Sequence, residues 1–190
     1  MIGEHLSEAQ RQQYRGRIRY WCEDETRVGL FTVQHRKLTG FGVKPVGDVQ
    51  WEFLYRWLYG VVEPQSGTSW FMEFSHLDSS CFEAALAGFA AQYPEELHVI
   101  QVDNASAHHA QTLTLPDNVI LLFQPPYSPE VNPIERLWQE LKRALAWMHF
   151  DSIAQLQQAI SRWVNQLSPE EVKSLMQWDW IVDALCVAGI

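Results

Sequence analysis

The sequence lacks features that would place it among membrane, secreted or disulfide-rich proteins. No apolar run approaches the roughly 18 residues needed to span a bilayer, and the start, MIGEHLSEAQRQQYRGR, lacks the apolar core of a signal peptide. The three cysteines are far apart and lack metal-ligand spacing, so neither a disulfide framework nor a zinc site is expected from them. We therefore expect a cytoplasmic protein without a membrane segment, in which Cys22, Cys81 and Cys186 are small buried apolar residues.

Internal repeats, low-complexity tracts and Gly/Ser linkers are also missing. The 190 residues are 47% apolar and include nine Trp, which is enough to bury one hydrophobic core. We expect one main domain at residues 17–165, with an N-terminal leader at residues 1–16 and a C-terminal helical tail at residues 166–190.

Positive charge is scarce, since 14 Lys and Arg face 23 Asp and Glu and give a net charge of −9. This balance is unfavourable for a DNA-binding protein, because affinity for phosphates usually depends on Lys and Arg. Residues 11–44 differ, with eight basic and three acidic residues, a local balance of +5 (8 − 3). Two interpretations, a solvated helix face or linker and an arm that contacts phosphates, stay open for Arg11, Arg15, Arg17 and Arg19.

Period-two alternation predicts strands in the first part of the chain. Residues 17–22 alternate and then run into an acidic cluster, which places Asp24 at or near a strand end. Residues 49–63 and 68–74 are also strand-like. The turn former PQSG between them predicts an antiparallel hairpin.

A helix and two strands are predicted in the middle of the chain. Ser80 and Glu83 have the spacing of a capping box, and apolar residues recur on one helical face over residues 81–93. The short apolar runs at residues 98–104 and 118–123 are typical of interior strands of a sheet.

The second half of the chain is predicted to be mainly helical. Asn132 as N-cap and Pro133 at the first helical position begin a helix whose apolar stripe faces the sheet. A second amphipathic helix follows residue 152, and a last helix is opened by Ser168, Pro169 and Glu171.

Three carboxylates carry the strongest functional signal, although each also has a structural explanation. Glu135 has the position of a capping-box residue, Asp103 follows a strand where turn residues are common, and Asp24 belongs to an acidic turn. Together, however, they are predicted to converge at one rim of the sheet. Their mutual repulsion would be removed by a hard divalent cation such as Mg²⁺.

Three segments resemble a known family: WCEDETRVGL at 21–30, VIQVDNASAHHA at 99–110 and QPPYSPEVNPIERLWQELKR at 124–143. They are similar to the DDE transposases of the mariner superfamily, specifically its bacterial insertion-sequence branch. The third segment is the most specific, because a Pro-Pro-Tyr-Ser-Pro loop followed by Asn-Pro-Ile-Glu and a Leu-Trp helix seldom arises by chance. The resemblance covers roughly residues 17–165.

The resemblance implies an α/β protein with a ribonuclease H-like mixed five-stranded sheet flanked by helices, and extra C-terminal helices. It implies that residues 17–165 are the DDE catalytic domain, with Asp24, Asp103 and Glu135 as the catalytic residues and metal ligands. Two Mg²⁺ ions are expected, and Mn²⁺ is expected to substitute for them. Such an enzyme is a DNA endonuclease and polynucleotidyl transferase, which cuts DNA strands at transposon ends and joins them to target DNA.

Several residues near the catalytic carboxylates are candidates for supporting roles. Asn104 and His108 match family positions beside the second Asp, where they would position a metal-bound water or a DNA phosphate. For Arg136, Lys142 and Arg143, contact with DNA phosphates and a solvated helix face are equally open.

The segment before the Glu135 helix departs slightly from the family pattern. Asp103 and Glu135 are separated by 31 residues (135 − 103 − 1), fewer than expected, which puts a local helix at residues 109–118 in doubt. Tyr127 is expected to pack beneath the helix, with stacking on a base as the alternative. Surface or packing roles are expected for His35, His76, His98, His109 and His149.

The resemblance also implies partners. These are DNA, a second copy of the chain in an active homodimer, and a DNA-binding half with helix-turn-helix segments. Because Asp24 comes so early, we expect that half to be encoded upstream, and either fused by frameshifting or supplied as a separate chain. The alternatives are a non-catalytic transposase remnant that binds DNA or full-length transposase, which the intact triad disfavours, and a nuclease for RNA–DNA hybrids, which PPYSPEVNPIE disfavours.

Overall fold

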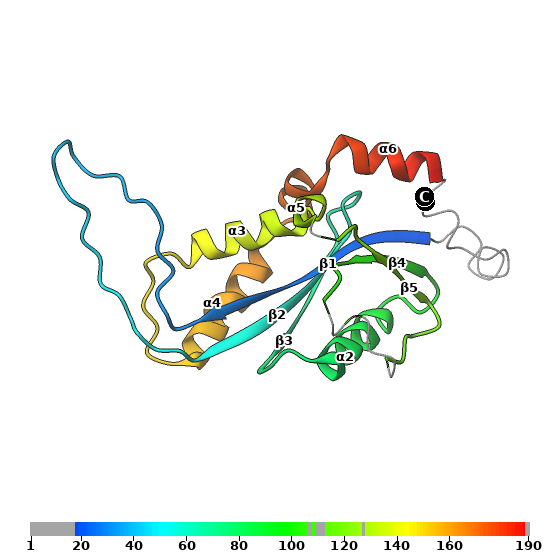
Figure 1. Cartoon of the computed structure of the whole chain (residues 1–190), viewed down its shortest axis with the longest axis horizontal. Helices are drawn as coiled ribbons and strands as arrows, with labels where there is room; N and C mark the ends of the chain where they lie inside the picture. The colour runs from blue at the N-terminus through cyan, green and yellow to red at the C-terminus, as the bar shows by residue number, and fades with distance from the viewer. Residues whose placement is uncertain (1–17, 106–107, 109–112, 127, 189–190) are drawn as a thin grey trace.

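The computed structural model describes residues 18–105, 108, 113–126 and 128–188 (Figure 1). Within these residues, five strands form one mixed sheet in the order β3-β2-β1-β4-β5. The strands are β1 (Ile18–Gly29), β2 (Tyr55–Val62), β3 (Ser69–Phe74), β4 (Leu97–Val102) and β5 (Val119–Phe123). The helical elements are α2 (Ser79–Ala90), η3 (Pro129–Val131), α3 (Ile134–Ala144), α4 (Ile153–Gln166), α5 (Pro169–Met176) and α6 (Asp179–Ala188).

The sheet is antiparallel on one side of β1 and parallel on the other. β1 pairs antiparallel with β2, which pairs antiparallel with β3, whereas β4 runs parallel to both β1 and β5. The predicted hairpin of residues 68–74 with the preceding strand is therefore confirmed. β5 lies at the edge of the sheet and not in its interior as predicted. When helices cover both faces of a sheet, a strand at the edge can be as apolar as a strand in the interior. The apolar composition of β5 therefore did not reveal that it is an edge strand.

One strand and one helix begin at residues that differ from the sequence prediction. β2 begins at Tyr55, whereas the alternation predicted a strand from residue 49. α2 begins before residue 81, because the Asp78 side chain accepts a hydrogen bond of 2.8 Å from the Cys81 amide and so caps the helix. The predicted capping box that starts at Ser80 is therefore wrong, because Asp78, two residues earlier, is the N-cap.

The C-terminal helices also differ in detail. α3 begins at Ile134 with Pro133 at its N-cap position, so the predicted N-cap, Asn132, is one residue too early. The Asn132 side chain still accepts a hydrogen bond of 3.4 Å from the Ile134 amide through Oδ1, and its Nδ2 donates one of 2.8 Å to the Glu23 carbonyl. The capping box of Ser168 at the start of α5 is confirmed. It does not open the last helix, however, because α6 follows.

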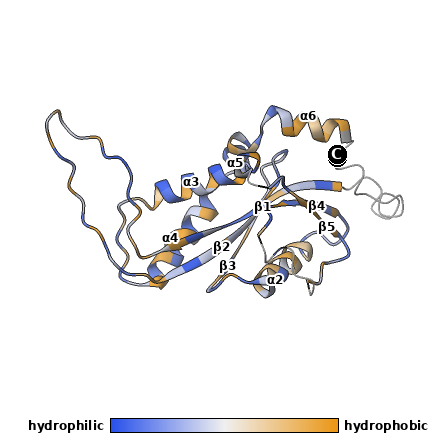
Figure 2. Ribbon diagram, in the orientation of Figure 1, coloured by the Kyte–Doolittle hydropathy of each residue, from blue (hydrophilic) through white to orange (hydrophobic). Residues whose placement is uncertain are grey.

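Each face of the sheet has its own hydrophobic core. α3 and α4 cover one face of the sheet and α2 covers the other (Figure 1), and apolar residues face inward from the helices (Figure 2). α5 and α6 belong to the first of these cores, to which they contribute Val172, Met176, Ile181 and Leu185. Within the described part of the predicted helical tail, α5 and α6 therefore pack on the same core as α3.

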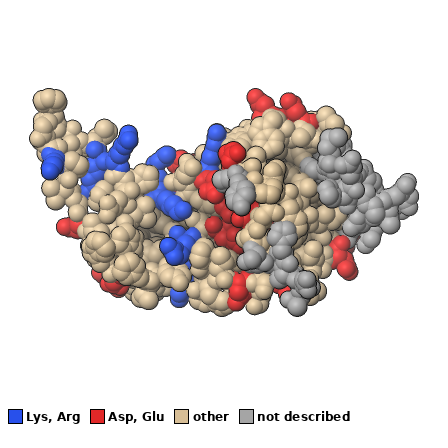
Figure 3. Space-filling model, in the orientation of Figure 1, with Lys and Arg blue, Asp and Glu red and all other residues tan. Residues whose placement is uncertain are grey.

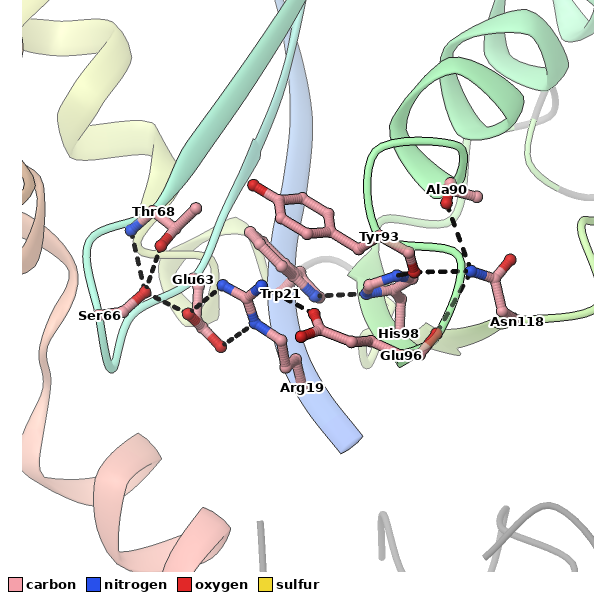
Figure 4. Close-up of polar contacts among 10 residues, drawn as sticks. All are labelled: Arg19, Trp21, Glu63, Ser66, Thr68, Ala90, Tyr93, Glu96, His98 and Asn118. Atoms are coloured by element: carbon pink, nitrogen blue, oxygen red, sulfur yellow. Dashed lines mark hydrogen bonds and ion pairs between the residues drawn. The ribbon is translucent and has the colours of Figure 1, made fainter. Parts of the chain in front are cut away.

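The N-terminal end of β1 is held by a polar network far from the acidic cluster (Figure 4). Arg19 Nε and Nη2 donate to both carboxylate oxygens of Glu63 at 2.8 and 2.6 Å, and Nη1 donates to Glu96 at 2.9 Å. The guanidinium also lies 4.3 Å from the ring centre of Trp21. Both interpretations of Arg19 are therefore wrong, since it is neither solvated nor free for phosphate. The leader 1–16, Arg11, Arg15 and Arg17 lie outside the described residues.

Residues 31–54 form a long loop that extends away from the sheet between β1 and β2 (Figure 1). Its base is anchored to the segment after α3, where Trp147 Nε1 donates to the His35 carbonyl at 3.0 Å. Several large apolar side chains of this loop are exposed. They include Leu38, Phe41, Val43, Val46, Trp51 and Phe53.

The cysteine prediction holds for two of the three residues. Cys22 and Cys81 are buried, whereas Cys186 is exposed on α6, whose apolar face is covered on one side only. Of the histidines predicted to pack or to lie at the surface, His98 is buried, while His35, His76 and His149 are exposed. His109 lies outside the described residues. No helix in the described part of the chain is long and apolar enough to cross a membrane.

Candidate active site

β1 carries three adjacent acidic residues whose side chains alternate between the two faces of the sheet. Asp24 lies on the same face as Cys22, which belongs to the core beneath α3 and α4. Glu23 and Glu25 lie on the same face as Trp21, which packs beneath α2. The run of three acids is therefore divided between two different environments.

Asp24 lies in the middle of β1, not near a strand end as predicted. β1 continues to Gly29 because it stays paired with β2, in which Gly60 lies opposite Asp24. On the other side of β1, the parallel strand β4 already ends at Val102. Asp103 is the next residue, just beyond the paired residues of the two strands. The candidate carboxylate that lies at a strand end is therefore Asp103, directly after β4.

Asp24 is half-buried in a strongly unfavourable place for a negative charge. Trp138 Nε1 donates a hydrogen bond of 2.9 Å to Asp24 Oδ2. Burial raises the pKa of Asp24 to about 8, and the negative charges of Glu135 and then Glu25 contribute to this rise. The structure thus brings Asp24 and Glu135 close enough to repel each other.

Glu135 lies in the first turn of α3 and its side chain is exposed. Pro133 at the N-cap position makes no side-chain hydrogen bond, and the side chain that accepts from an amide at this helix start is that of Asn132, from Ile134 at 3.4 Å; no capping bond by the Glu135 side chain is seen among the described residues. An acidic side chain at a helix start is favoured by the helix dipole, but here it also faces another carboxylate. This arrangement suits a ligand for a cation.

The carboxylate of Asp103 is engaged with His108. His108 Nδ1 lies 2.9 Å from Asp103 Oδ1, and His108 Nε2 lies 3.2 Å from Glu25 Oε1. Burial lowers the pKa of His108, but its contacts with Glu25 and Asp103 outweigh burial, so that the pKa is raised. The convergence of Asp103 with Asp24 and Glu135 around one pair of metal ions stays a prediction. The His108 ring is buried, so it is not available to a DNA phosphate.

An open cavity of about 440 Å³ lies next to Asp103, lined by the loops that follow β4 and β5. The two loops are joined by Asn104, whose Nδ2 donates a hydrogen bond of 2.7 Å to the Gln124 carbonyl. Asn104 therefore holds the walls of this cavity in place. Tyr127, which belongs to the second loop, lies outside the described residues.

The three basic residues of α3 have different surroundings. Arg136 is exposed and its guanidinium lies 4.7 Å from the ring centre of Trp178. Arg143 is exposed and forms an ion pair with Glu140 one turn earlier. Lys142 is half-buried and lines a cavity at the base of the long loop. Their contact with DNA stays a prediction.

The family model of the DDE superfamily endonucleases matches residues 19–157, which is more than half of the chain. The chain belongs to the DDE superfamily endonucleases. A relative from Sinorhizobium fredii, the uncharacterized protein y4pE/y4sA, is 30% identical over 90 residues, covering 47% of this chain and 67% of that protein.

Solved structures with Mos1 transposase have the same fold as this DDE superfamily endonuclease. The Mos1 paired-end complex with the left transposon end matches with a TM-score of 0.65 and 17% identity, over 90% of this chain and 59% of that chain. The Mos1 strand transfer complex matches with a TM-score of 0.65 and 16% identity, over the same shares. The predicted ribonuclease H-like fold is confirmed. The chain spans about three fifths of the Mos1 chain.

The donor set of this DDE superfamily endonuclease fits a hard divalent cation. Asp24 and Glu135 offer carboxylate oxygens, which Mg²⁺ and Mn²⁺ prefer as ligands. The raised pKa of Asp24 has burial as its largest cause and the negative charge of Glu135 as the next, so without a cation the charged form of Asp24 is disfavoured. A cation between them would turn this repulsion into attraction.

Sequence reasoning missed two residues that shape the site of this endonuclease. Trp138 was assigned only to an apolar stripe, yet its indole N–H holds Asp24. Gly60 makes room for the indole, because a Cβ atom at this position would lie 2.5 Å from the Trp138 ring. The signal was present in the ERLW spacing, which puts Glu135 and Trp138 on adjacent turns of one helical face.

Replacing Trp138 with Phe is expected to lower metal-dependent DNA cleavage about 10-fold or more. The substitution keeps most of the buried ring but removes the N–H that orients Asp24, and outer-shell partners of metal ligands are typically worth 10–100-fold. Cleavage rates at several Mn²⁺ concentrations measure the effect, which we expect in both the rate and the metal affinity. Trp163→Phe on α4 is the control. An unchanged metal dependence in Trp138→Phe would show that the indole only fills space.

Proposed function

We propose that this chain is the catalytic domain of a transposase that cuts DNA strands at transposon ends and joins them to target DNA. Asp24, Asp103 and Glu135 are the proposed catalytic residues and ligands for Mg²⁺ or Mn²⁺, with two ions expected. The proposal is carried mainly by the position of Asp24 against α3, the helix that begins with Glu135 in its first turn and holds the Asp24 carboxylate through the Trp138 indole. Membership of the DDE superfamily endonucleases supports it.

Each side chain has a defined task in this proposal. Divalent ions, when bound, activate the attacking oxygen and stabilise the leaving oxygen of a phosphoryl displacement. Asp24 is fixed by the indole of Trp138, so it presents its carboxylate in one orientation. Glu135 is exposed at the start of α3 and Asp103 lies at the open cavity, so both reach a substrate that comes from solvent. Catalysis is then electrostatic and positional, without a covalent enzyme intermediate.

DNA is the proposed substrate despite the net charge of −9. On the face shown in Figure 3, acidic side chains gather near the middle, and Lys and Arg side chains lie beside them and toward the long loop. Arg136, the residue after Glu135 on α3, is exposed. This arrangement would place phosphates on basic groups next to the metal ligands.

Two protein partners complete the proposal. The scarcity of basic residues and the coverage of three fifths of the Mos1 chain support a separate DNA-binding half that recognises transposon ends. The exposed apolar side chains of residues 31–54 support contact with a second copy of the chain in an active homodimer, because large exposed apolar patches mark interaction surfaces.

The proposed function is tested by nicking of supercoiled plasmid in the presence of Mn²⁺ or Mg²⁺. Glu135→Gln is expected to lose nicking while its free energy of unfolding stays within about 1 kcal/mol of the parent, the usual size of a helix cap. Gln keeps the size and polarity of Glu but is a poor ligand for Mg²⁺. Chemical denaturation measures the stability.

Glu140→Gln is the matched control on the same helix. It breaks only an exposed ion pair with Arg143, and such pairs contribute little to stability. We expect it to nick plasmid at the parental rate. Full nicking by a folded Glu135→Gln, or no metal-dependent nicking by the parent chain, would contradict the catalytic assignment; the latter result would favour a non-catalytic protein that binds DNA.

A further inference from the structure

A second group of potential metal ligands lies on the opposite face of the sheet from Asp24. Glu23, Glu25 and His108 each have a carboxylate oxygen or ring nitrogen within 4.8 Å of the others. Glu23 and Glu25 flank Asp24 in the sequence but point toward the core beneath α2. The group is therefore separated from Asp24 and Glu135 by the backbone of β1.

Two polar side chains in this region are buried without a hydrogen-bond partner among the described residues. Both carboxylate oxygens of Glu23 lack a partner, although the residue is only 1% exposed. The hydroxyl of Tyr59 also lacks one, and this residue is fully buried. Leaving such groups unsatisfied is costly, so a native protein usually supplies water, a proton or an ion.

The Tyr59 hydroxyl lies close to the same carboxylates. Tyr59 is directly opposite Glu25 in the pairing of β1 with β2, which places their side chains on one face. Burial raises the pKa of Tyr59, and the negative charges of Glu25 and Glu23 raise it further. A polar side chain from a second strand therefore lies on the same face of the sheet as Glu23 and Glu25, within reach of their negative charges.

His108 has the geometry of a metal-bound imidazole. Nδ1 is directed at Asp103, 2.9 Å from Oδ1 and 3.2 Å from the carbonyl oxygen, while Nε2 faces Glu25. Histidine ligands in proteins usually donate one ring N–H to a carboxylate or carbonyl and bind the metal through the other nitrogen. The ring is also fixed by Phe82, whose centre lies 4.2 Å away.

We propose that Glu23, Glu25 and His108 bind one Zn²⁺ ion, with the Tyr59 hydroxyl at the edge of the site. One imidazole and two carboxylates are a typical set for zinc, whereas Mg²⁺ prefers oxygen ligands and keeps several waters that this buried place would exclude. The charge of the ion balances the two carboxylates. None of the proposed catalytic residues is a ligand of this site, although His108 contacts the Asp103 carboxylate.

This site would fix the segment that carries Asp103. An ion bound to Nε2 leaves the proton of His108 on Nδ1, where it holds the Asp103 carboxylate and carbonyl. The ion would thereby join β1 to the residues that follow β4. Its role is structural, as the ligand atoms lie in the core beneath α2.

Metal binding by the Asp24→Asn/Glu135→Gln variant of the chain tests the proposal, because this protein lacks two of the three proposed catalytic carboxylates. After treatment with a chelator, we expect it to bind one equivalent of Zn²⁺ in calorimetry, and Co²⁺ with visible absorption typical of low coordination number. Adding His108→Gln is expected to lower the affinity by more than about 100-fold, since even outer-shell partners contribute 10–100-fold.

His76→Gln in the same background is the matched control. His76 belongs to another group of possible ligands, with Asp78 and Cys81, at the start of α2. We expect this variant to keep the bound equivalent. The proposal would be overturned if His108→Gln kept the zinc and His76→Gln lost it. That result would assign the ion to the group of His76, Asp78 and Cys81.

Glu23→Gln gives a readout that does not depend on the fate of His108. With chelator it is expected to melt at a higher temperature than the chain with Glu23, because it removes a buried carboxyl group that has no hydrogen-bond partner among the described residues and whose pKa is raised by burial. With excess Zn²⁺ the order of the two melting temperatures is expected to reverse, since only the chain with Glu23 gains stability from the ion. Absence of zinc binding in the parent, or the same order of melting temperatures in both conditions, would refute the site.

Discussion

Asp24→Asn is expected to lower metal-dependent nicking by more than about 100-fold and to raise the melting temperature measured with chelator. The carboxylate is the proposed ligand held by Trp138, and even outer-shell partners of such ligands are worth 10–100-fold. The amide keeps an oxygen that accepts the indole N–H. At a pH above about 8, where the carboxylate of Asp24 is charged, the substitution also removes a half-buried negative charge that burial and then Glu135 disfavour, so we expect the rise in melting temperature there. Plasmid nicking and thermal unfolding of the same preparation measure both effects.

The opposite signs of these two effects make the prediction specific. Replacing a residue that only stabilises the fold would lower both the stability and the activity of the chain. Replacing a metal ligand held in an unfavourable place lowers the activity but raises the stability. Asp117→Asn, at an exposed turn before β5, is the control and should change neither quantity. Parental nicking by a folded Asp24→Asn would remove Asp24 from the catalytic residues.

Gly67→Ala is expected to destabilise the chain by about 3 kcal/mol or more. Gly67 has a φ of +76°, which strains an L-residue by roughly 1–2 kcal/mol. A Cβ atom would also lie 1.9 Å from the carbonyl oxygen of Pro169 at the start of α5, and overpacking of this kind costs roughly 1–3 kcal/mol. Chemical denaturation of the parent and the variant measures the difference.

Gly42→Ala separates the two causes. Gly42 also has a positive φ, +77°, but a Cβ atom there would meet nothing within 4 Å, since it lies on the long exposed loop. We expect a cost of less than about 1 kcal/mol, because an exposed loop relaxes locally. Equal costs for the two substitutions would show that α5 is not firmly packed against the β2–β3 turn, and that the tail at residues 166–190 contributes little to the core.

Local patterns predicted most of the elements and the family of the chain. The spacing of apolar residues on α3 and α4, the Ser168 capping box and the PQSG turn depend on residues within one or two turns of each other. Such interactions are encoded locally and survive in any tertiary context. The segment PPYSPEVNPIE identified the family for the same reason, as a continuous stretch of sequence.

The sequence by itself therefore determined that this chain is a DDE superfamily endonuclease and named Asp24, Asp103 and Glu135 as its candidate catalytic residues. Only the tertiary structure decided their surroundings, since Trp138 reaches Asp24 across 114 residues and His108 reaches Glu25 across 83. The burial that perturbs Asp24 exists only once α3 packs on β1. Contacts between distant segments depend on how strands and helices pack in space. The periodicity of apolar residues along one strand or helix does not predict which distant residues it will contact.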